Sequence, residues 1–166
     1  MVALIRATSP DEWAVAGRLV DEYAASLGIA LDFQNFAHER THLAEEYGPP
    51  HAMFLLATDA GAFVGCGGLR RHSEAACEMK RLYVTPQGQG RGVGRQIALA
   101  LIADARAMGY RTILLDTLPS MQRAQRLYRS LGFEPTAPYR FNPVEGTAFL
   151  ALDLSRPAAA GGPPGE

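Results

Sequence analysis

Apolar and polar residues follow two different rhythms along this chain, and the changes of rhythm predict its elements. Apolar residues three and four positions apart are typical of helices, whereas alternation or short apolar runs are typical of strands. The predicted helices cover residues 9–27, 33–47, 93–108 and 119–131. The predicted strands cover residues 2–7, 53–57, 63–69, 77–84 and 112–116, with a closing hairpin at 133–141 and 147–154. This order predicts a mixed α/β fold, with about six or seven strands in one sheet and about four helices around it.

A glycine-rich loop joins the strand at 77–84 to the helix at 93–108. Its sequence from residue 84 is Val-Thr-Pro-Gln-Gly-Gln-Gly-Arg-Gly-Val-Gly-Arg. Glycine at every second position leaves much of the backbone bare, so N–H groups at the helix start can point at one place. The helix dipole favours an anion there, and Arg91 and Arg95 add positive charge at the same end. We therefore expect this loop to bind a phosphate.

The loop fits one of the known phosphate-binding patterns. A P-loop would need Gly-Lys followed by Ser or Thr, and the dinucleotide pattern GxGxxG fails in every register. Gln89 to Gly94 fits [Gln/Arg]-x-x-Gly-x-[Gly/Ala], and it resembles the acyl-CoA pyrophosphate loop of the GNAT N-acetyltransferase superfamily. Residues 124–133, Ala-Gln-Arg-Leu-Tyr-Arg-Ser-Leu-Gly-Phe, resemble the AxxLYxxxGF helix of the same family. The resemblance covers residues 2–154 and is to small, single-domain, bacterial-type members.

The resemblance implies a GNAT fold, whose mixed sheet is splayed between the fourth and fifth strands, and acetyl-CoA as the co-substrate. Many members of the family place an asparagine seven residues before the tyrosine of the later helix, where it helps to hold the pantetheine arm. Here Met121 stands at that position, and Ser120 is the candidate to replace the contact. The coenzyme-binding residues implied in this way are Leu82, Tyr83, Val84, Gln89, Gly90, Arg91, Gly92, Val93, Gly94, Arg95 and Ser120.

Acetyl transfer to an amine needs a stabilised oxyanion, a base for the amine and an acid for the thiolate. By resemblance, the oxyanion donor is a backbone N–H near Leu82, where the strand of the family is bulged. Glu78 is the candidate base, acting directly or through a water, although it can equally be ion-paired with Lys80. Tyr128 is the candidate acid, because a phenol can protonate a nascent thiolate. The alternative for Tyr128 is a core tyrosine, since it shares the apolar stripe of its helix.

The segment from His38 to His42, His-Glu-Arg-Thr-His, is a literal HExxH pattern. On a helix this pattern can present two imidazoles to zinc and a glutamate as base, so a zinc peptidase is a remote alternative function. The longer HExxHxxGxxH pattern fails, because Glu45 and Gly48 stand where glycine and the third histidine are required. We expect no metal, and solvated or acceptor-facing histidines instead.

The amine acceptor is the least defined partner, since a small molecule and a peptide fit the sequence equally well. By resemblance, the first two helices and the closing hairpin shape its pocket. The candidate wall residues are Phe33, Phe36, His38, His42, Tyr139 and Arg140. Arg140 is a candidate clamp for a carboxylate or phosphate of the acceptor, or else an exposed hairpin arginine.

Composition and charge limit the domain organisation, the partners and the cellular location that we expect. The 166 residues are 48% hydrophobic, which suits one domain, expected over residues 1–155, with a disordered tail at 156–166. A net charge of −1 argues against nucleic-acid or membrane partners, and no signal peptide is seen, so we expect a cytoplasmic enzyme. Cys66 and Cys77 are expected as buried free thiols. The sequence leaves a homodimer open, as well as a non-catalytic acyl-CoA-binding module.

Overall fold

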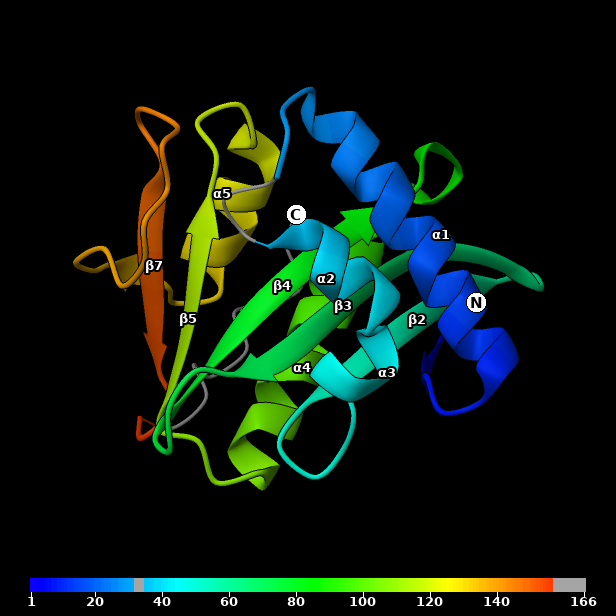
Figure 1. Ribbon diagram of the computed structural model, residues 1–166, viewed down its shortest axis with the longest axis horizontal. Helices are drawn as coiled ribbons and strands as arrows, with labels where there is room; N and C mark the ends of the chain where they lie inside the picture. The colour runs from blue at the N-terminus through cyan, green and yellow to red at the C-terminus, as the bar shows by residue number, and fades with distance from the viewer. Residues whose placement is uncertain (32–34, 157–166) are drawn as a thin grey trace.

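A computed structural model of the chain describes residues 1–31 and 35–156. Within them, seven strands form one sheet in the order β1-β2-β3-β4-β5-β7-β6 (Figure 1). The strands are β1 (Val2–Arg6), β2 (Met53–Asp59), β3 (Ala62–Arg71), β4 (Ala76–Val84), β5 (Thr112–Thr117), β6 (Glu134–Pro135) and β7 (Ala148–Asp153). The helices are α1 (Pro10–Leu27), α2 (Phe36–Thr41), α3 (Leu43–Glu46), α4 (Val93–Ala107) and α5 (Gln122–Ser130), with a 3₁₀ turn η2 (Pro86–Gly88). The predicted mixed α/β architecture is confirmed.

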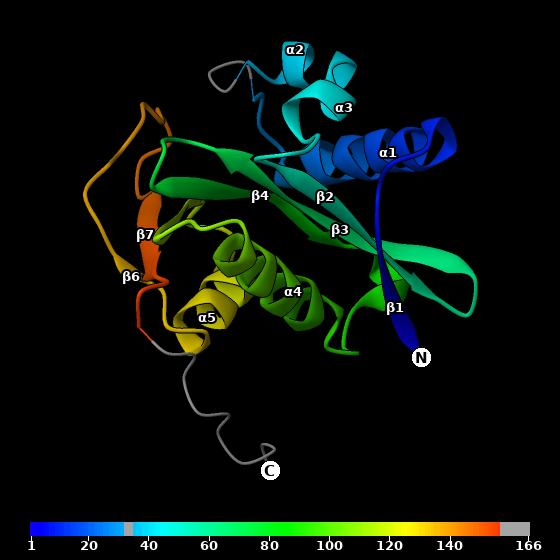
Figure 2. The same cartoon turned by 90° about the horizontal axis from the view of Figure 1, so that it is seen from below.

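Helices cover both faces of the sheet. Figure 2 shows α1, α2 and α3 on one face, with α4 and α5 on the other. Each face has its own buried apolar cluster: Ile97 and Leu101 of α4 pack in one, and Leu19 and Val20 of α1 in the other. None of the helices in the described ranges combines the length and apolar content needed to cross a bilayer.

The first helix begins and ends where the sequence predicts. Ser9 accepts a hydrogen bond from the Glu12 amide, and the Glu12 carboxylate accepts one from the Ser9 amide, which together form a capping box. Pro10 occupies the first turn, and Gly28 ends the helix in the left-handed conformation at φ 67°.

The helix predicted at 33–47 is interrupted, which is a correction. It is divided into α2 and α3 at His42, whose φ is −128°. The Thr41 hydroxyl bonds to the carbonyls of Ala37 and His38, and Nδ1 of His42 lies 2.8 Å from the His38 carbonyl oxygen. These side chains compete with the next helical amides for the same carbonyls. Phe33 and residues 157–166 of the expected tail lie outside the described residues.

Two further boundaries differ from the prediction. Helix α5 begins at Gln122, after a turn in which the Met121 amide bonds to the Leu118 carbonyl. The closing hairpin has only two residues, Glu134 and Pro135, in β6, so most of residues 136–147 form a loop. Proline at positions 135, 138 and 143 removes amide donors that a longer ladder would need.

The sheet opens between β4 and β5, as expected from the family resemblance. The two strands are parallel, and they pair only from Ala76 to Glu78 on β4 and from Thr112 to Leu114 on β5. Beyond these three rungs the strands diverge, and helix α4, which connects them, covers one face of the sheet (Figure 1). The divergence leaves residues 79–84 of β4 without a β5 partner.

Candidate active site

The glycine-rich loop ends in a helix start that has no cap. Gly92 is the N-cap of α4 and has no side chain to cap it. The first helical hydrogen bond runs from the Gln96 amide to the Gly92 carbonyl. Among the described residues, the amides of 93–95 donate to no backbone carbonyl and no capping side chain. These donors are oriented along the helix axis, where an anion is favoured.

The glycines of this loop have different roles. Gly90 and Gly92 adopt left-handed φ values of 81° and 73°, and a Cβ at either would meet nothing within 4 Å. They give the loop its backbone path and leave open space beside it. Gly88 is instead buried, and a Cβ there would lie 2.9 Å from Val64. Gly88 therefore allows close packing of the loop on β3.

The two loop arginines have protein partners that the sequence did not predict. Arg91 pairs with Asp59, the last residue of β2, and the Arg91 side chain is 61% exposed. Arg95 Nη1 donates a hydrogen bond to the Ser130 hydroxyl at 3.1 Å. Arg91 directly precedes the N-cap Gly92, and Arg95 is the third residue of α4. Both side chains therefore still add positive charge at the start of the helix.

Strand β4 is bulged at Arg81 and Leu82. Cys66 of β3 pairs with Tyr83, and Gly68 pairs with Lys80, so two residues of β4 face Gly67 alone. Arg81 adopts a left-handed φ of 60°, which is unusual for a side chain of this size. A bulge of this kind interrupts the ladder and redirects backbone groups. The expected bulge near Leu82 is therefore present.

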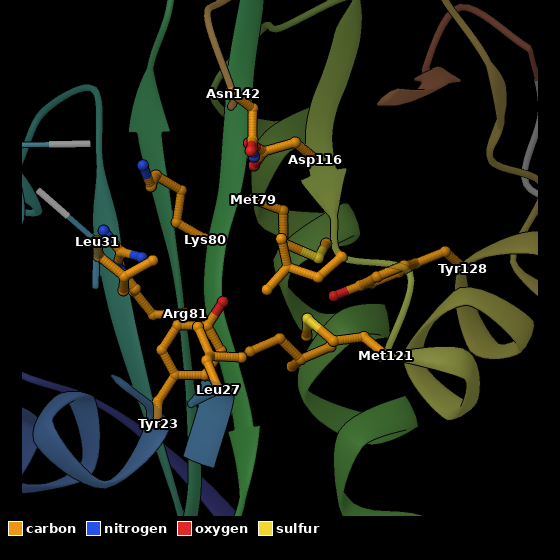
Figure 3. Close-up of a pocket in the computed structure, with 12 residues that line it drawn as sticks. Tyr23, Leu27, Leu31, Met79, Lys80, Arg81, Asp116, Met121, Tyr128 and Asn142 are labelled. Carbon is orange, nitrogen blue, oxygen red and sulfur yellow. The ribbon is translucent and has the colours of Figure 1, made fainter. Parts of the chain in front are cut away.

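A pocket lies where β4 and β5 diverge (Figure 3). It combines the second half of α1, the bulged part of β4 and the carboxyl end of β5 with Met121 before α5 and Tyr128 in the last turn of α5. Its lining residues are Tyr23, Leu27, Leu31, Met79, Lys80, Arg81, Leu82, Asp116, Leu118, Met121, Tyr128 and Asn142. Two sequence candidates, Leu82 and Tyr128, thus meet in one pocket.

Tyr128 lies on the pocket wall and packs against Phe133 with a centroid separation of 5.6 Å. The side chain is buried, and burial raises the pKa of its phenol. Its hydroxyl donates to no other described residue, so it is available to a ligand. Met121 also lines the pocket, whereas Ser120 is exposed and is not among the lining residues.

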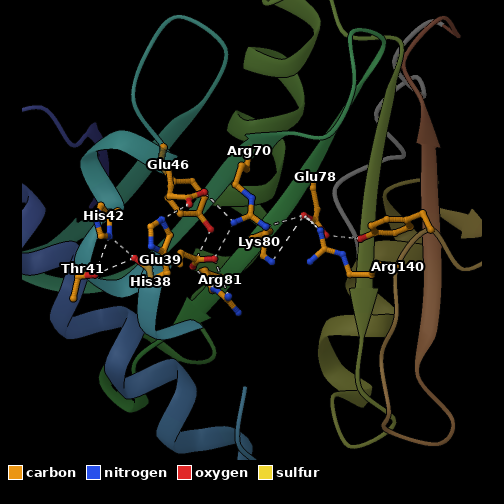
Figure 4. A network of polar contacts seen from close by, with 12 residues as sticks. His38, Glu39, Thr41, His42, Glu46, Arg70, Glu78, Lys80, Arg81 and Arg140 are labelled. Carbon is orange, nitrogen blue, oxygen red and sulfur yellow. Dashed lines mark hydrogen bonds and ion pairs between the residues drawn. The ribbon is translucent and has the colours of Figure 1, made fainter. Parts of the chain in front are cut away.

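Glu78 is buried and both of its carboxylate oxygens have partners (Figure 4). The Tyr139 hydroxyl donates to Oε2 at 2.7 Å, and Arg140 Nη2 donates to Oε1 at 2.6 Å. Arg70 Nη2 and Lys80 Nζ lie 3.6 and 3.9 Å from Oε1. This arrangement favours the ion-pair alternative for Glu78. It also shows that Tyr139 and Arg140 both form hydrogen bonds with Glu78.

Lys80 is a site residue that the sequence predicts only as an ion-pair partner of Glu78. Its ammonium is buried and, within the described residues, has no hydrogen-bond acceptor. Burial lowers its pKa to about 7, against the opposing effect of the Glu78 carboxylate. A lysine in an alternating strand carries no sequence signal for burial, because the pattern equally suits a solvated side chain.

Glu39 of the HExxH segment points into the protein. Its carboxylate accepts from Arg81 Nε at 2.7 Å, from Arg81 Nη2 at 3.0 Å and from the Tyr47 hydroxyl at 3.1 Å. Arg70 Nη1 donates to it at 3.2 Å. Burial acts to raise the pKa of Glu39, but the hydrogen bond and charge of Arg81, together with the charges of Lys80 and Arg70, lower it overall. The carboxylate is thus committed to a buried ion pair.

The two histidines of that segment stack on each other at a centroid distance of 4.0 Å. His38 is about half exposed, and its Nε2 lies 3.8 Å from Glu46. In the described ranges, no three histidine, cysteine or acidic residues are grouped as metal ligands would be. Phe36, an expected wall residue, has its ring centroid 5.3 Å from the Arg81 guanidinium and is not among the residues that line the pocket.

The cysteines are free and buried, as expected. Burial raises the pKa of both thiols, that of Cys77 to about 12. Cys66 donates to the Arg81 carbonyl at 3.3 Å, beside the bulge.

Comparisons with known proteins point to one family. The sequence model of the Acetyltransferase (GNAT) family matches residues 18–133. An uncharacterized N-acetyltransferase of Schizosaccharomyces pombe is 38% identical over 83% of this chain and 86% of its own length. A GNAT acetyltransferase structure from Staphylococcus aureus superposes with a TM-score of 0.75 at 18% identity, covering 93% of this chain and 99% of that one. The structure of yncA from Salmonella typhimurium with its cofactor acetyl-CoA has a TM-score of 0.66 at 21% identity, covering 97% and 98%.

Proposed function

Because the chain belongs to the GNAT acetyltransferase family, we propose that it moves the acetyl group of acetyl-CoA to a primary amine of a small molecule or peptide. One observation carries this proposal: the uncapped start of α4 lies next to the opening between β4 and β5. A diphosphate on the amides of 93–95 would leave the rest of the coenzyme directed toward that opening. The open space beside Gly90 and Gly92 fits such a ligand.

The bulge supplies the group for the oxyanion. Beyond Glu78, β4 has no β5 partner, so its backbone can pair with the amides of the pantetheine arm as a strand would. The Leu82 amide then follows the bulge and faces the thioester carbonyl. A fixed N–H donor of this kind stabilises the charge that develops on the oxygen in the tetrahedral intermediate.

In this proposal Asp116 is the general base and Tyr128 is the general acid. Asp116 is the acidic residue among those lining the pocket, and it takes one proton from the acceptor ammonium. The amine nitrogen then bonds to the carbonyl carbon, loses its second proton to water, and the carbon–sulfur bond breaks. Tyr128 protonates the departing thiolate and is reprotonated from solvent. Glu78 is assigned to the buried ion-pair network and not to the base, because its oxygens are already occupied.

Two measurements test the proposal. Titration calorimetry with acetyl-CoA should show binding, and a thiol reagent should detect coenzyme release when a panel of amines is added. Absence of binding at millimolar acetyl-CoA would overturn the proposal. Binding without thiol release from any amine would instead favour a non-catalytic acyl-CoA-binding module. Stoichiometric zinc in protein purified without chelators, together with peptide cleavage, would favour the peptidase.

A further inference from the structure

Lys80 presents a buried ammonium without a hydrogen-bond partner at the wall of the pocket. Its side chain is 3% exposed, and within the described residues Nζ donates to no acceptor. Oε1 of Glu78 lies 3.9 Å away, which is too far for a hydrogen bond, and that oxygen already accepts from Arg140. A buried ammonium without a partner costs free energy unless a ligand supplies a hydrogen-bond acceptor or a counter-charge.

Several charged side chains surround Lys80 in the part of the chain that the structure describes. The cations are Arg70, Lys80, Arg81 and Arg140, and the carboxylates are Glu39, Glu46 and Glu78. Burial lowers the pKa of Lys80 to about 7, and the neighbouring arginines act in the same direction. An anion that entered the pocket beside Lys80 would favour its ammonium form.

An acidic side chain faces Lys80 across the opening. Glu78 and Leu114 form the last rung between β4 and β5, so Lys80 and Asp116 each lie two residues beyond it and on the same face. Asp116 accepts one hydrogen bond, from Asn142 at 3.1 Å through Oδ2. All three side chains line the pocket (Figure 3). The pocket therefore has a cationic wall on β4 and an acidic wall on β5.

We propose that the acceptor is an amino acid or a similar amine with a carboxylate, whose carboxylate binds Lys80 while its ammonium lies beside Asp116. This inference rests on the proposed function, since it names the acceptor class of the same pocket. The β4 wall carries Lys80 and Arg81, of which Arg81 is paired with Glu39, and the β5 wall carries Asp116. The opposite charges of the two walls give the acceptor one orientation. This arrangement also selects against amines without an acidic group, because they would leave the Lys80 ammonium buried and unpaired.

The test compares each of the common amino acids with its carboxamide as acceptor, using thiol release from acetyl-CoA. Wild-type protein should acetylate at least one free acid with a kcat/KM about tenfold to a hundredfold above that of its amide. Lys80→Met should remove that preference, chiefly by lowering kcat/KM for the free acid toward the value for its amide. Arg71→Met is the control: it removes an exposed charge on β3, and the preference should be retained.

Equal rates for acids and amides would overturn the inference while leaving the transferase proposal standing. A Lys80→Met protein that keeps the preference would overturn it as well. Should no amine release thiol, the proposed function fails, and thermal shifts then decide the inference. Free acids, but not amides, should stabilise the CoA-loaded wild type, and Lys80→Met should lose that shift. If Lys80→Met does not fold, the acid and amide comparison on the wild type decides alone.

Discussion

Arg81 and Glu39 form a bidentate ion pair that joins helix α2 to the bulge of β4. Arg81 Nε and Nη2 donate to the two Glu39 oxygens at 2.7 and 3.0 Å, and both residues are buried. Arg81 is also the residue with the left-handed φ of 60°, immediately before Leu82. The pair therefore holds the strained residue whose conformation determines where the Leu82 amide points.

Removing the Glu39 charge should be strongly destabilising. We expect Glu39→Gln to lower the free energy of unfolding by about 3–5 kcal/mol, because it removes the carboxylate charge from a buried bidentate ion pair. Urea denaturation followed by circular dichroism measures this. Glu46→Gln is the control, since Glu46 also pairs with Arg70 but is partly exposed, and it should cost less than about 1 kcal/mol. Equal losses of unfolding free energy in the two variants would show that the buried pair contributes no more to stability than the partly exposed one.

The Tyr128 hydroxyl should matter for turnover and not for stability. In the proposed mechanism, Tyr128→Phe lowers kcat by about a hundredfold to ten-thousandfold, as expected for the loss of a general acid. The affinity for acetyl-CoA and the unfolding midpoint should change little, because the hydroxyl bonds to no described residue. Tyr110→Phe provides the contrast: its hydroxyl donates to the His51 carbonyl at 2.6 Å, so its loss should cost about 1 kcal/mol and leave kcat unchanged. An unchanged kcat in Tyr128→Phe would show that Tyr128 is not the general acid.

Coenzyme binding should depend on Gly92 and not on Gly28, a left-handed glycine that ends α1. Gly92→Ala and Gly28→Ala both put a Cβ on a left-handed residue with open space around it. Each should therefore destabilise the fold by about 1–2 kcal/mol. Only Gly92→Ala should also weaken acetyl-CoA binding, by about tenfold or more in calorimetry, because its N-cap conformation orients the amides of 93–95. Matching affinities in the two variants would argue against the α4 start as the diphosphate site.

Lys80 should make stability increase with pH. Its pKa is lowered from 10.5 to about 7 in the fold, so between these values the unfolded chain binds more protons than the native chain. The free energy of unfolding therefore rises, through this residue, by up to about 1.4 kcal/mol per pH unit in that window. We expect Lys80→Met to be more stable than wild type at pH 7, with a difference that shrinks by pH 9.5. Tyrosine and cysteine ionisation affects both proteins alike, so the difference between their urea midpoints isolates Lys80.

The two thiols should be silent in the native protein. Burial raises the pKa of Cys66 and Cys77, and neither carries a thiolate at pH 8. A thiol reagent should therefore react with neither until urea unfolds the chain, when both should react. Rapid reaction of the folded protein would contradict their burial and would also add a background to the acetyltransferase assay.

The sequence identified the parts of the site that depend on local backbone. The alternation of residues 77–84, the glycines after them and the periodic helix at 93–108 predicted the strand, loop and helix that the structure contains. The resemblance added the bulge near Leu82 and the opening between β4 and β5. These features depend on short segments and on strand order, both of which a single sequence records.

The charged network escaped prediction because its members are far apart in the sequence. Glu39 and Arg81 are 42 positions apart, and each belongs to a pattern that suggested something else: an HExxH helix and a plain strand. Lys80 and Asp116 come together only because β4 and β5 share a register of three rungs. Side-chain bonds from Thr41 and His42 likewise interrupted a helix that periodicity alone would have continued.

The three-rung pairing of β4 with β5 has a thermodynamic meaning for the whole protein. An extended ligand arm along β4 would occupy the place of the missing neighbour, and its binding would complete the sheet. Occupancy and folding are then linked by mass action, so the melting temperature becomes a function of ligand concentration. Measured without acetyl-CoA, the stability of this chain would be that of an incomplete sheet.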